Sequence, residues 1–387
     1  MRLTSVRPRL LSIITVVAAL ALADDSGSEP LSQGPTTSKT APTQPAAPVH
    51  SLDRNPRPQL QAKSVYAAPP NTVYVLAGSG PGLTDHPALF RSGDGGQHFA
   101  RVHLPSAKPF LWLKFVDAEH GYAVLGGVGL NQRTSLMYTT DGARSWHPAT
   151  LPRAESHISA IDGQGGRVFA AAIQCPHTQT CPHGNARIYS SALGSKSWHP
   201  TAATFPRHDL AGGVGFTAWG DSIWITLGNG MEPRQVTMMS TDSGRTFAPS
   251  NTSNAVACYP NATSAQITWT TCSTGMLLAF YRHSGEMNPQ KLPIAGAGTG
   301  GTFLNPLDDH DAYFGTAMGS DAGLYLTRDG GHTFDRLAGL PRLLVRSMNT
   351  GQLVFLDTAI GIAPLSGPNL LRTSNGGHTW HAVRFTQ

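Results

Sequence analysis

Short apolar runs separated by polar turns recur along the chain from about residue 62 to its end. Five pairs of such runs, each with a polar turn between its members, begin at Phe115, Ala160, Phe216, Phe303 and Phe355. Runs of this length that are bounded by Gly, Asn and Asp are typical of β-strands joined by tight turns. No convincing period of 3.6 residues appears beyond the N-terminus, so the pattern predicts an all-β domain.

An eight-residue motif, which we call the box, repeats along the chain. The clear copies are SGDGGQHF at Ser92, TTDGARSW at Thr139, STDSGRTF at Ser240, TRDGGHTF at Thr327 and TSNGGHTW at Thr373. A degenerate copy, SALGSKSW, begins at Ser191, and the closing aromatics of all six are 47, 52, 49, 87 and 46 residues apart. Because 87 is nearly twice the other spacings, we expect one more unit there, at the weak stretch YRHSGEMNPQKLP.

The spacing therefore predicts seven units. A repeat of about 40 to 50 residues is typical of a propeller or a solenoid. Each unit has two strands before the box, a third that leads into it and a fourth that starts at its aromatic, and four strands make a propeller blade. We predict a single β-propeller over residues 62–387. Its expected blades are residues 62–104, 108–152, 155–206, 210–250, 253–295, 298–340 and 343–386.

Each position of the box has a role in a turn. The Asp or Asn can accept hydrogen bonds from the N–H groups that follow it, and the initial hydroxyl adds a local partner. Glycine at the fifth position tolerates a positive φ, and the final aromatic can bury a large area between neighbouring sheets. We therefore expect structural roles, and no catalytic one, for Ser92, Asp94, Gly96, Phe99, Thr139, Asp141, Ser145, Trp146, Ser240, Asp242, Gly244, Thr246, Phe247, Thr327, Asp329, Gly331, Thr333, Phe334, Thr373, Asn375, Gly377, Thr379 and Trp380.

This repeated box resembles that of the Asp-box, or bacterial neuraminidase repeat (BNR), propellers. The likeness is most specific in TRDGGHTF at Thr327 and STDSGRTF at Ser240, and it covers residues 62 to 386. The element FVDAEHGYAV from Phe115 to Val124 looks most like the photosystem II assembly and stability factor branch of these sialidase-like proteins. The resemblance implies the propeller fold and a binding role, without implying work on a photosystem.

The same resemblance implies a rival function, because sialidases share the box. A sialidase would need three arginines on the substrate carboxylate, a tyrosine paired with a glutamate as nucleophile, and an aspartate as acid and base. The usual Arg-Ile-Pro element before the first box is missing, since the chain reads DHPALFRSGDGG there. The only glutamates are Glu29, Glu119, Glu155, Glu232 and Glu286. We expect no catalytic residues, and a sialidase-type glycoside hydrolase is the alternative.

The N-terminus predicts export. Three arginines precede an apolar run from Leu10 to Leu22, and the small residues that end at Ala23 form a cleavage site, so residues 1–23 are typical of a signal peptide. The run is too short for stable membrane insertion, although an uncleaved anchor is the alternative. Residues 24–61 are rich in Pro, Ser, Thr and Ala, which predicts a disordered linker. We expect a secreted, periplasmic or cell-surface protein.

Four cysteines and two histidines are the remaining candidates for chemistry. An even number of cysteines in an exported protein favours disulfides, here the local pairs Cys175–Cys181 and Cys258–Cys272. The rival interpretation is a metal site, a second alternative function, formed by Cys175, His177, Cys181 and His183. The acidic stretch from Asp308 to Asp311 aligns with a turn in another unit and is expected to be solvated. No cofactor is expected.

Charge excludes one class of partner. The formal net charge is only +5, and the Lys and Arg residues are scattered without interleaved aromatics, so we expect no nucleic acid. We expect a monomer that binds a protein, peptide or glycan on one face of the propeller.

Overall fold

The computed structural model describes residues 60–79, 87–105, 110–126, 134–152, 157–173, 185–206, 215–227, 236–250, 257–274, 277–284, 290–293, 302–316, 323–337, 344, 352–365 and 367–386. All of these belong to one compact unit, Pro56–Gln387. The predicted signal peptide and nearly all of the predicted linker lie outside the described residues. Within the described part of the chain, no helix is long and apolar enough to cross a lipid bilayer.

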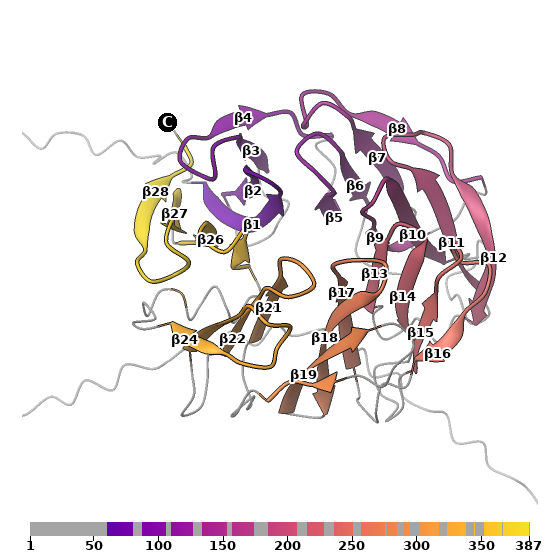
Figure 1. Ribbon diagram of the computed structural model, residues 1–387. Coiled ribbons are helices and arrows are strands. Elements are labelled where there is room, and N and C mark those ends of the chain that lie inside the picture. The colour runs from indigo at the N-terminus through magenta and orange to yellow at the C-terminus, as the bar shows by residue number, and fades with distance from the viewer. Residues whose placement is uncertain are drawn as a thin grey trace, which may run out of the picture. The chain divides into compact units, whose positions relative to one another are not determined.

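Seven four-stranded antiparallel sheets, each made of consecutive strands, surround a common centre (Figure 1). Blade 1 contains β1 (Gln61–Ala68), β2 (Thr72–Gly78), β3 (Ala88–Ser92) and β4 (Ala100–Val102). Blade 2 contains β5 (Phe110–Phe115), β6 (Gly121–Leu125), β7 (Ser135–Thr139) and β8 (His147–Ala149). Blade 3 contains β9 (His157–Asp162), β10 (Arg167–Ile173), β11 (Asn185–Ala192) and β12 (His199–Pro206).

The other four blades repeat this order. Blade 4 contains β13 (Gly215–Trp219), β14 (Ser222–Leu227), β15 (Val236–Ser240) and β16 (Ala248–Ser250). Blade 5 contains β17 (Ala257–Ala262), β18 (Ile267–Thr274), β19 (Leu277–Ser284) and β20 (Gln290–Lys291). Blade 6 contains β21 (Thr302–Pro306), β22 (Ala312–Thr316), β23 (Gly323–Thr327) and β24 (Asp335–Leu337). Blade 7 contains β25 (Val354–Phe355), β26 (Gly361–Pro364), β27 (Asn369–Thr373) and β28 (His381–Arg384).

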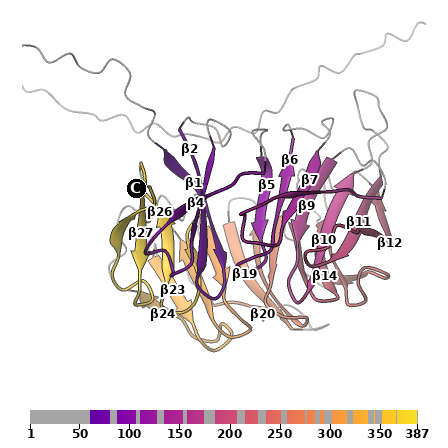
Figure 2. The same ribbon diagram turned by 90° about the horizontal axis from the view of Figure 1, so that it is seen from above.

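The predicted all-β fold with seven four-stranded blades is confirmed. Strands run from one face of the ring toward the other (Figure 2). Every strand lies inside one of the predicted repeat units, except that β1 begins at Gln61, one residue before the first unit. The second strand of a blade is covered on both sides, so all five residues of β6 are buried.

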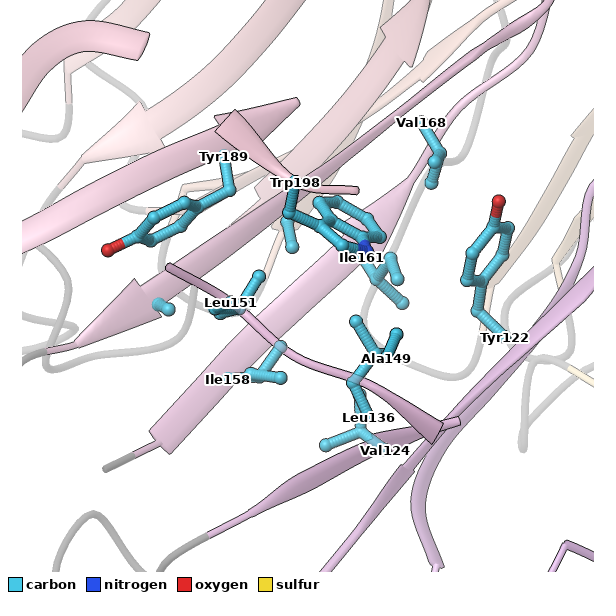
Figure 3. Packing of buried hydrophobic residues seen from close by; sticks show 12 residues of the cluster. Tyr122, Val124, Leu136, Ala149, Leu151, Ile158, Ile161, Val168, Tyr189 and Trp198 are labelled. Carbon is cyan, nitrogen blue, oxygen red and sulfur yellow. The ribbon is translucent and has the colours of Figure 1, made fainter. Parts of the chain in front are cut away.

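The aromatic that closes a box packs toward the preceding blade. Trp198 of blade 3 lies in a cluster with Leu136 and Tyr122 of blade 2 (Figure 3), and the Trp198 and Tyr122 rings meet edge to face with centroids 6.1 Å apart. Phe247 of blade 4 meets Phe205 of blade 3 in the same way at 5.1 Å. Edge-to-face pairs of this kind add to the free energy gained by apolar burial. The box therefore supplies an aromatic side chain to the interface between its own blade and the preceding blade.

The seam between blades 4 and 5 is built differently. Among the described residues, an apolar cluster joins every other pair of neighbouring blades, and blade 5 is the one whose box is lost. Here Ser222 Oγ donates to the carbonyl of Ala265 at 2.9 Å, and Ala262 N donates to Thr217 Oγ1 at 3.1 Å. Loss of the closing aromatic thus coincides with a polar seam.

Blades 7 and 1 close the ring by packing, without exchange of a strand. β1 contacts β25, β26 and β27, and Figure 1 shows the indigo blade beside the yellow one. Phe385, 1% exposed, meets Phe90 edge to face with centroids 5.2 Å apart. Arg372 Nε donates to the carbonyl of Gly95 at 2.7 Å. The backbone comes so close that a Cβ on Gly96 would lie 2.5 Å from Ile362 Cδ1, which explains the need for glycine there.

Candidate functional site

A central cavity of about 820 Å³ is lined by the first strand of all seven blades. Its wall combines apolar residues of β21 and β25, such as Phe303 and Phe355, with polar residues of the strands between β5 and β17. Volumes of this order are typical of small-molecule and cofactor sites. The cavity is therefore the first candidate for a binding site.

A chain of polar contacts crosses four consecutive blades along this wall. Lys114 Nζ of β5 lies 2.8 Å from Asp162 Oδ1 of β9. Thr217 Oγ1 of β13 donates to Asp162 Oδ2 at 2.8 Å and accepts the N–H of Ala262 of β17 at 3.1 Å. The N–H of Gly163 also donates to the carboxylate at 2.9 Å. Because the Asp162 side chain is only 11% exposed, these partners are what make its charge tolerable there.

Similar contacts continue around the ring. Thr263 Oγ1 of blade 5 donates to Asp309 Oδ1 of blade 6 at 2.7 Å. The N–H of Phe355 in blade 7 donates to Asn305 Oδ1 of blade 6 at 2.5 Å. These side chains are used to join blades, so they are poorly placed to serve a ligand at the same time.

Other polar groups of the cavity remain available. Gln164, Asn261 and Thr271 line it, and their side chains have no hydrogen-bond partner within the described part of the chain. Tyr259 also lines the cavity, and it is 56% exposed although it is a large aromatic residue. An exposed aromatic beside free amide and hydroxyl groups can both stack on a ligand and hydrogen-bond to it.

The predicted box residues lie outside this cavity and form turns. In blade 2, Thr139 Oγ1 donates to Asp141 Oδ1 at 2.8 Å and accepts the N–H of Ala143 at 3.0 Å. Asp141 also accepts the N–H of Ser145 at 2.9 Å and its hydroxyl at 2.6 Å. Burial alone would raise the pKa of Asp141, but the hydrogen bonds from Ser145 and Thr139 outweigh it and lower the pKa to about 2.

In the boxes that begin at Ser240 and Thr327, hydroxyl, carboxylate and N–H groups pair as in blade 2. The box at Ser92 differs at its seventh position, where His98 Nδ1 lies 2.7 Å from Asp94 Oδ2 in place of a hydroxyl. The pKa values of Asp94, Asp242 and Asp329 are lowered as well. In blade 7 Asn375 replaces the aspartate, and its Oδ1 still accepts the N–H of Thr379 at 2.9 Å.

The fifth box position has a positive φ in each clear copy. The four glycines there are Gly96, Gly244, Gly331 and Gly377, with φ between 79° and 89°. In blade 2 the position is held by Ala143, with a φ of 66°. The turn thus demands the backbone conformation more strictly than it demands glycine.

Two boxes depart from the pattern. In blade 3 Ser191 Oγ donates to the carbonyl of Ser197 at 2.8 Å, which holds the turn without a carboxylate. In blade 5 His283 pairs with Thr268 across the strands, as Thr327 pairs with Ala312 in blade 6, so it occupies the position of the box hydroxyl. His283 is 4% exposed, and burial lowers its pKa to about 4. Neither His283 Nε2 nor Thr268 Oγ1 has a hydrogen-bond partner among the described residues.

The residues that a sialidase would need are not assembled in the central cavity. Among the described residues, Lys114 and Asp162 are the only charged ones that line it, and no arginine or glutamate does. Three arginines do converge elsewhere, in a second cavity between blades 1 and 2 that is described below. The tyrosine that contacts one of them, Tyr74, is fully buried and donates its hydroxyl to the carbonyl of Ala118 at 2.8 Å.

The cysteine predictions are only partly covered by the structure. Cys175, His177, Cys181 and His183 lie outside the described residues. Cys258 and Cys272 are directly paired in the backbone register of β17 and β18, which favours their predicted disulfide. Asp308 Oδ1 accepts the N–H groups of His310 and Asp311 at 2.7 Å each, as in a turn. Within the described ranges, no three His, Cys, Asp or Glu side chains gather where they could hold a metal ion.

Sequence reasoning missed the polar chain of the cavity and a set of arginines. Lys114, Asp162 and Thr217 are polar residues in the second half or at the middle of the first strands of three successive blades, and that repeated position was a usable signal. Arg282 and Arg372 immediately precede the box position on the third strand. Arg282 donates to the carbonyl of Asp309 in the next blade, as Arg372 does to that of Gly95. Both therefore bind blade to blade.

Comparison with known proteins supports the fold. No known family profile and no curated protein sequence matches the chain. Among solved structures, an uncharacterised protein from Listeria monocytogenes has a TM-score of 0.54 at 7% identity, with 84% of this chain and 95% of that chain covered. A puromycin-hydrolysing peptidase from Mycobacterium tuberculosis has a TM-score of 0.52 at 13% identity, with 85% of this chain and 54% of that chain covered. YCF48 from Cyanidioschyzon merolae has a TM-score of 0.46 at 15% identity, with 73% and 87% covered. The chain spans about half the length of the peptidase. At these identities the likeness to the Listeria and Mycobacterium structures supports the β-propeller fold alone.

Proposed function

We propose that this protein is an exported, non-enzymatic binding module that holds an uncharged polar ligand, a glycan or a peptide segment, in its central cavity. The observation that carries the proposal is the cavity of about 820 Å³, in which Tyr259 is exposed beside polar side chains that have no hydrogen-bond partner in the described part of the chain. Lys114 and Asp162 neutralise each other, so the described part of the lining has no net charge to attract an ion. Stacking and hydrogen bonds are the interactions that remain for a ligand.

The same lining argues against glycoside hydrolysis. Hydrolysis by the common mechanism needs two carboxyl groups on either side of the scissile bond. Asp162 is the only carboxylate among the described residues that line the cavity, and Lys114, Thr217 and Gly163 already occupy it. Binding without turnover is therefore the function that the site supports best.

A binding screen with two variants tests this proposal. Immobilised neutral glycans and uncharged peptides are screened with the wild-type protein, and the best ligand is titrated. Tyr259→Ala is expected to weaken its binding by about tenfold, the effect of losing one aromatic stack. Tyr138→Ala on β7, whose side chain does not line the cavity, is the matched control and is expected to leave binding unchanged.

Two results would contradict the proposal. Equal affinities of Tyr259→Ala and the wild type would place the ligand elsewhere. Turnover of a fluorogenic sialoside by the wild type would make the protein a hydrolase.

A further inference from the structure

A second cavity, of about 410 Å³, lies where the third and fourth strands of blade 1 meet the box turn of blade 2. We call it the arginine groove. Arg91 of β3, Arg101 and His103 at β4, and Arg144 of the blade 2 box line it. No acidic residue of the described ranges lines it. Three permanent positive charges therefore surround one small cavity.

These guanidinium groups keep most of their hydrogen-bond donors free. Arg91 donates from Nε to Tyr74 Oη at 3.3 Å and from a terminal nitrogen to the carbonyl of Ala118 at 3.5 Å. Arg144 donates once, to the carbonyl of Asp141 at 3.1 Å. Arg101 has no partner within the described ranges of the chain. Since each guanidinium carries five N–H donors, the fold accounts for only a minority of them.

The carboxylates nearby in sequence do not neutralise the groove. Within the described residues no ion pair joins Arg91, Arg101 or Arg144 to an acidic side chain. Asp117, in the adjoining turn of blade 2, is paired with His120 at 2.9 Å. Gathering like charges without a counter-charge costs free energy, which a bound anion would offset.

The walls of the groove are fixed to each other. The N–H of His103 donates to the carbonyl of Ala143 at 3.1 Å, and His103 Nδ1 donates to that of Arg144 at 2.6 Å. The indole of Trp146 donates to the carbonyl of His103 at 3.0 Å. Three bonds thus hold the end of β4 against the blade 2 box, so little ordering would be needed on binding.

We propose that the arginine groove binds a tetrahedral oxyanion, the phosphate group of a free ion or of a phosphate monoester. A phosphate dianion matches this excess of positive charge better than a monoanion does. Its oxygens also point in several directions, which suits donors that arrive from β3, β4 and a turn, whereas a carboxylate offers two coplanar oxygens. This site is independent of the ligand proposed for the central cavity.

The repeats supply a matched control. Arg144 occupies the sixth position of its box, and Arg245 occupies the same position in blade 4. Arg101 follows the closing aromatic of its box by two residues, as Arg336 does in blade 6. The double variant Arg101→Gln/Arg144→Gln therefore has the counterpart Arg245→Gln/Arg336→Gln, which removes as much charge from equivalent positions outside the groove.

Calorimetric titration at constant ionic strength tests the proposal, with inorganic phosphate, glycerol 3-phosphate and acetate as separate probes. We expect saturable binding of phosphate by the wild type and by the control, and about tenfold or greater loss in the groove variant. Tighter binding of glycerol 3-phosphate would identify a phosphate carried on a larger molecule, and equal or weaker binding would identify the free ion. Circular dichroism checks that each variant is folded, and Arg101→Gln alone serves if the double variant is not.

Three results would overturn the proposal. Absence of saturable phosphate binding would remove the site. An equal loss in the groove variant and its counterpart would show an effect of net charge alone. Acetate bound as tightly as phosphate would show that the groove does not select tetrahedral anions.

Discussion

The buried histidine of blade 5 should make the ring sensitive to mild acid. His283 sits where the intact blades have a box hydroxyl, it is 4% exposed, and burial lowers its pKa to about 4 from the ordinary 6.5. As the pH falls below 6.5, the unfolded chain therefore binds a proton before the folded chain does. The difference in pKa therefore costs no stability above pH 6.5, and the folded state loses stability as the pH falls from 6.5 toward 4.

The size of the effect follows from the two pKa values. At pH 5 the unfolded imidazole is almost fully protonated while the folded one is mostly neutral, which costs the folded state about 2 kcal/mol relative to pH 7. Asp141, whose pKa is lowered to about 2, stays ionised over this interval and contributes nothing to the change. His283→Thr places a hydroxyl at this position, as in the other boxes, and has no group that titrates there.

Denaturant unfolding at pH 7 and pH 5, followed by tryptophan fluorescence, measures this contribution. The wild type should lose about 2 kcal/mol more between the two pH values than His283→Thr does. His283→Leu provides the same comparison if the threonine variant is too unstable at pH 7. The reasoning is refuted if wild type and variant lose the same stability within about 0.5 kcal/mol, an interval set by the extrapolation.

Three further predictions concern the turns, the seam and the cysteines. Asp141→Ala should lower the free energy of unfolding by about 1 to 2 kcal/mol. Asp141→Asn should cost less than half of that, because its amide oxygen can still accept the N–H of Ser145, and denaturant unfolding of both variants measures the difference. Phe385→Ala should cost about 3 to 5 kcal/mol, since it leaves a void between blades 7 and 1, and a loss below 1 kcal/mol would contradict closure by packing. Unfolded, unreduced protein should show no free thiol and peptide mapping should link Cys258 to Cys272, and a reactive thiol at either would exclude that pair.

The sequence was most informative where a local rule repeats. A box needs only hydroxyl, carboxylate and backbone groups within eight residues, so its copies and their spacing predicted the number of blades and of strands in each. The degenerate copies were harder, because the sequence does not reveal that Ser191 holds its turn through a backbone carbonyl or that His283 Nε2 is buried with no partner among the described residues.

The cavity and the groove could not be predicted, since both depend on neighbours far apart in the chain. Asp162 meets Thr217 across 55 residues, and Arg372 meets Gly95 across 277. No local sequence pattern predicts which side chains of neighbouring blades contact each other. Two of the three arginines of the groove, Arg91 and Arg101, lie on neighbouring strands of blade 1, and Arg144 lies in a turn of the next unit, so they look scattered until the blades are assembled.

Because the ring closes without an exchanged strand, the fold does not fix the blade at which the chain has to start. Every sheet is one continuous piece of chain, and the seam between the first and last blades is side-chain packing like most of the others. The seam between blades 7 and 1 therefore needs no covalent feature that another apolar seam lacks. A circular permutant that joins the present ends and opens between blades 4 and 5, where the seam is polar, would keep all six apolar seams intact within the described residues.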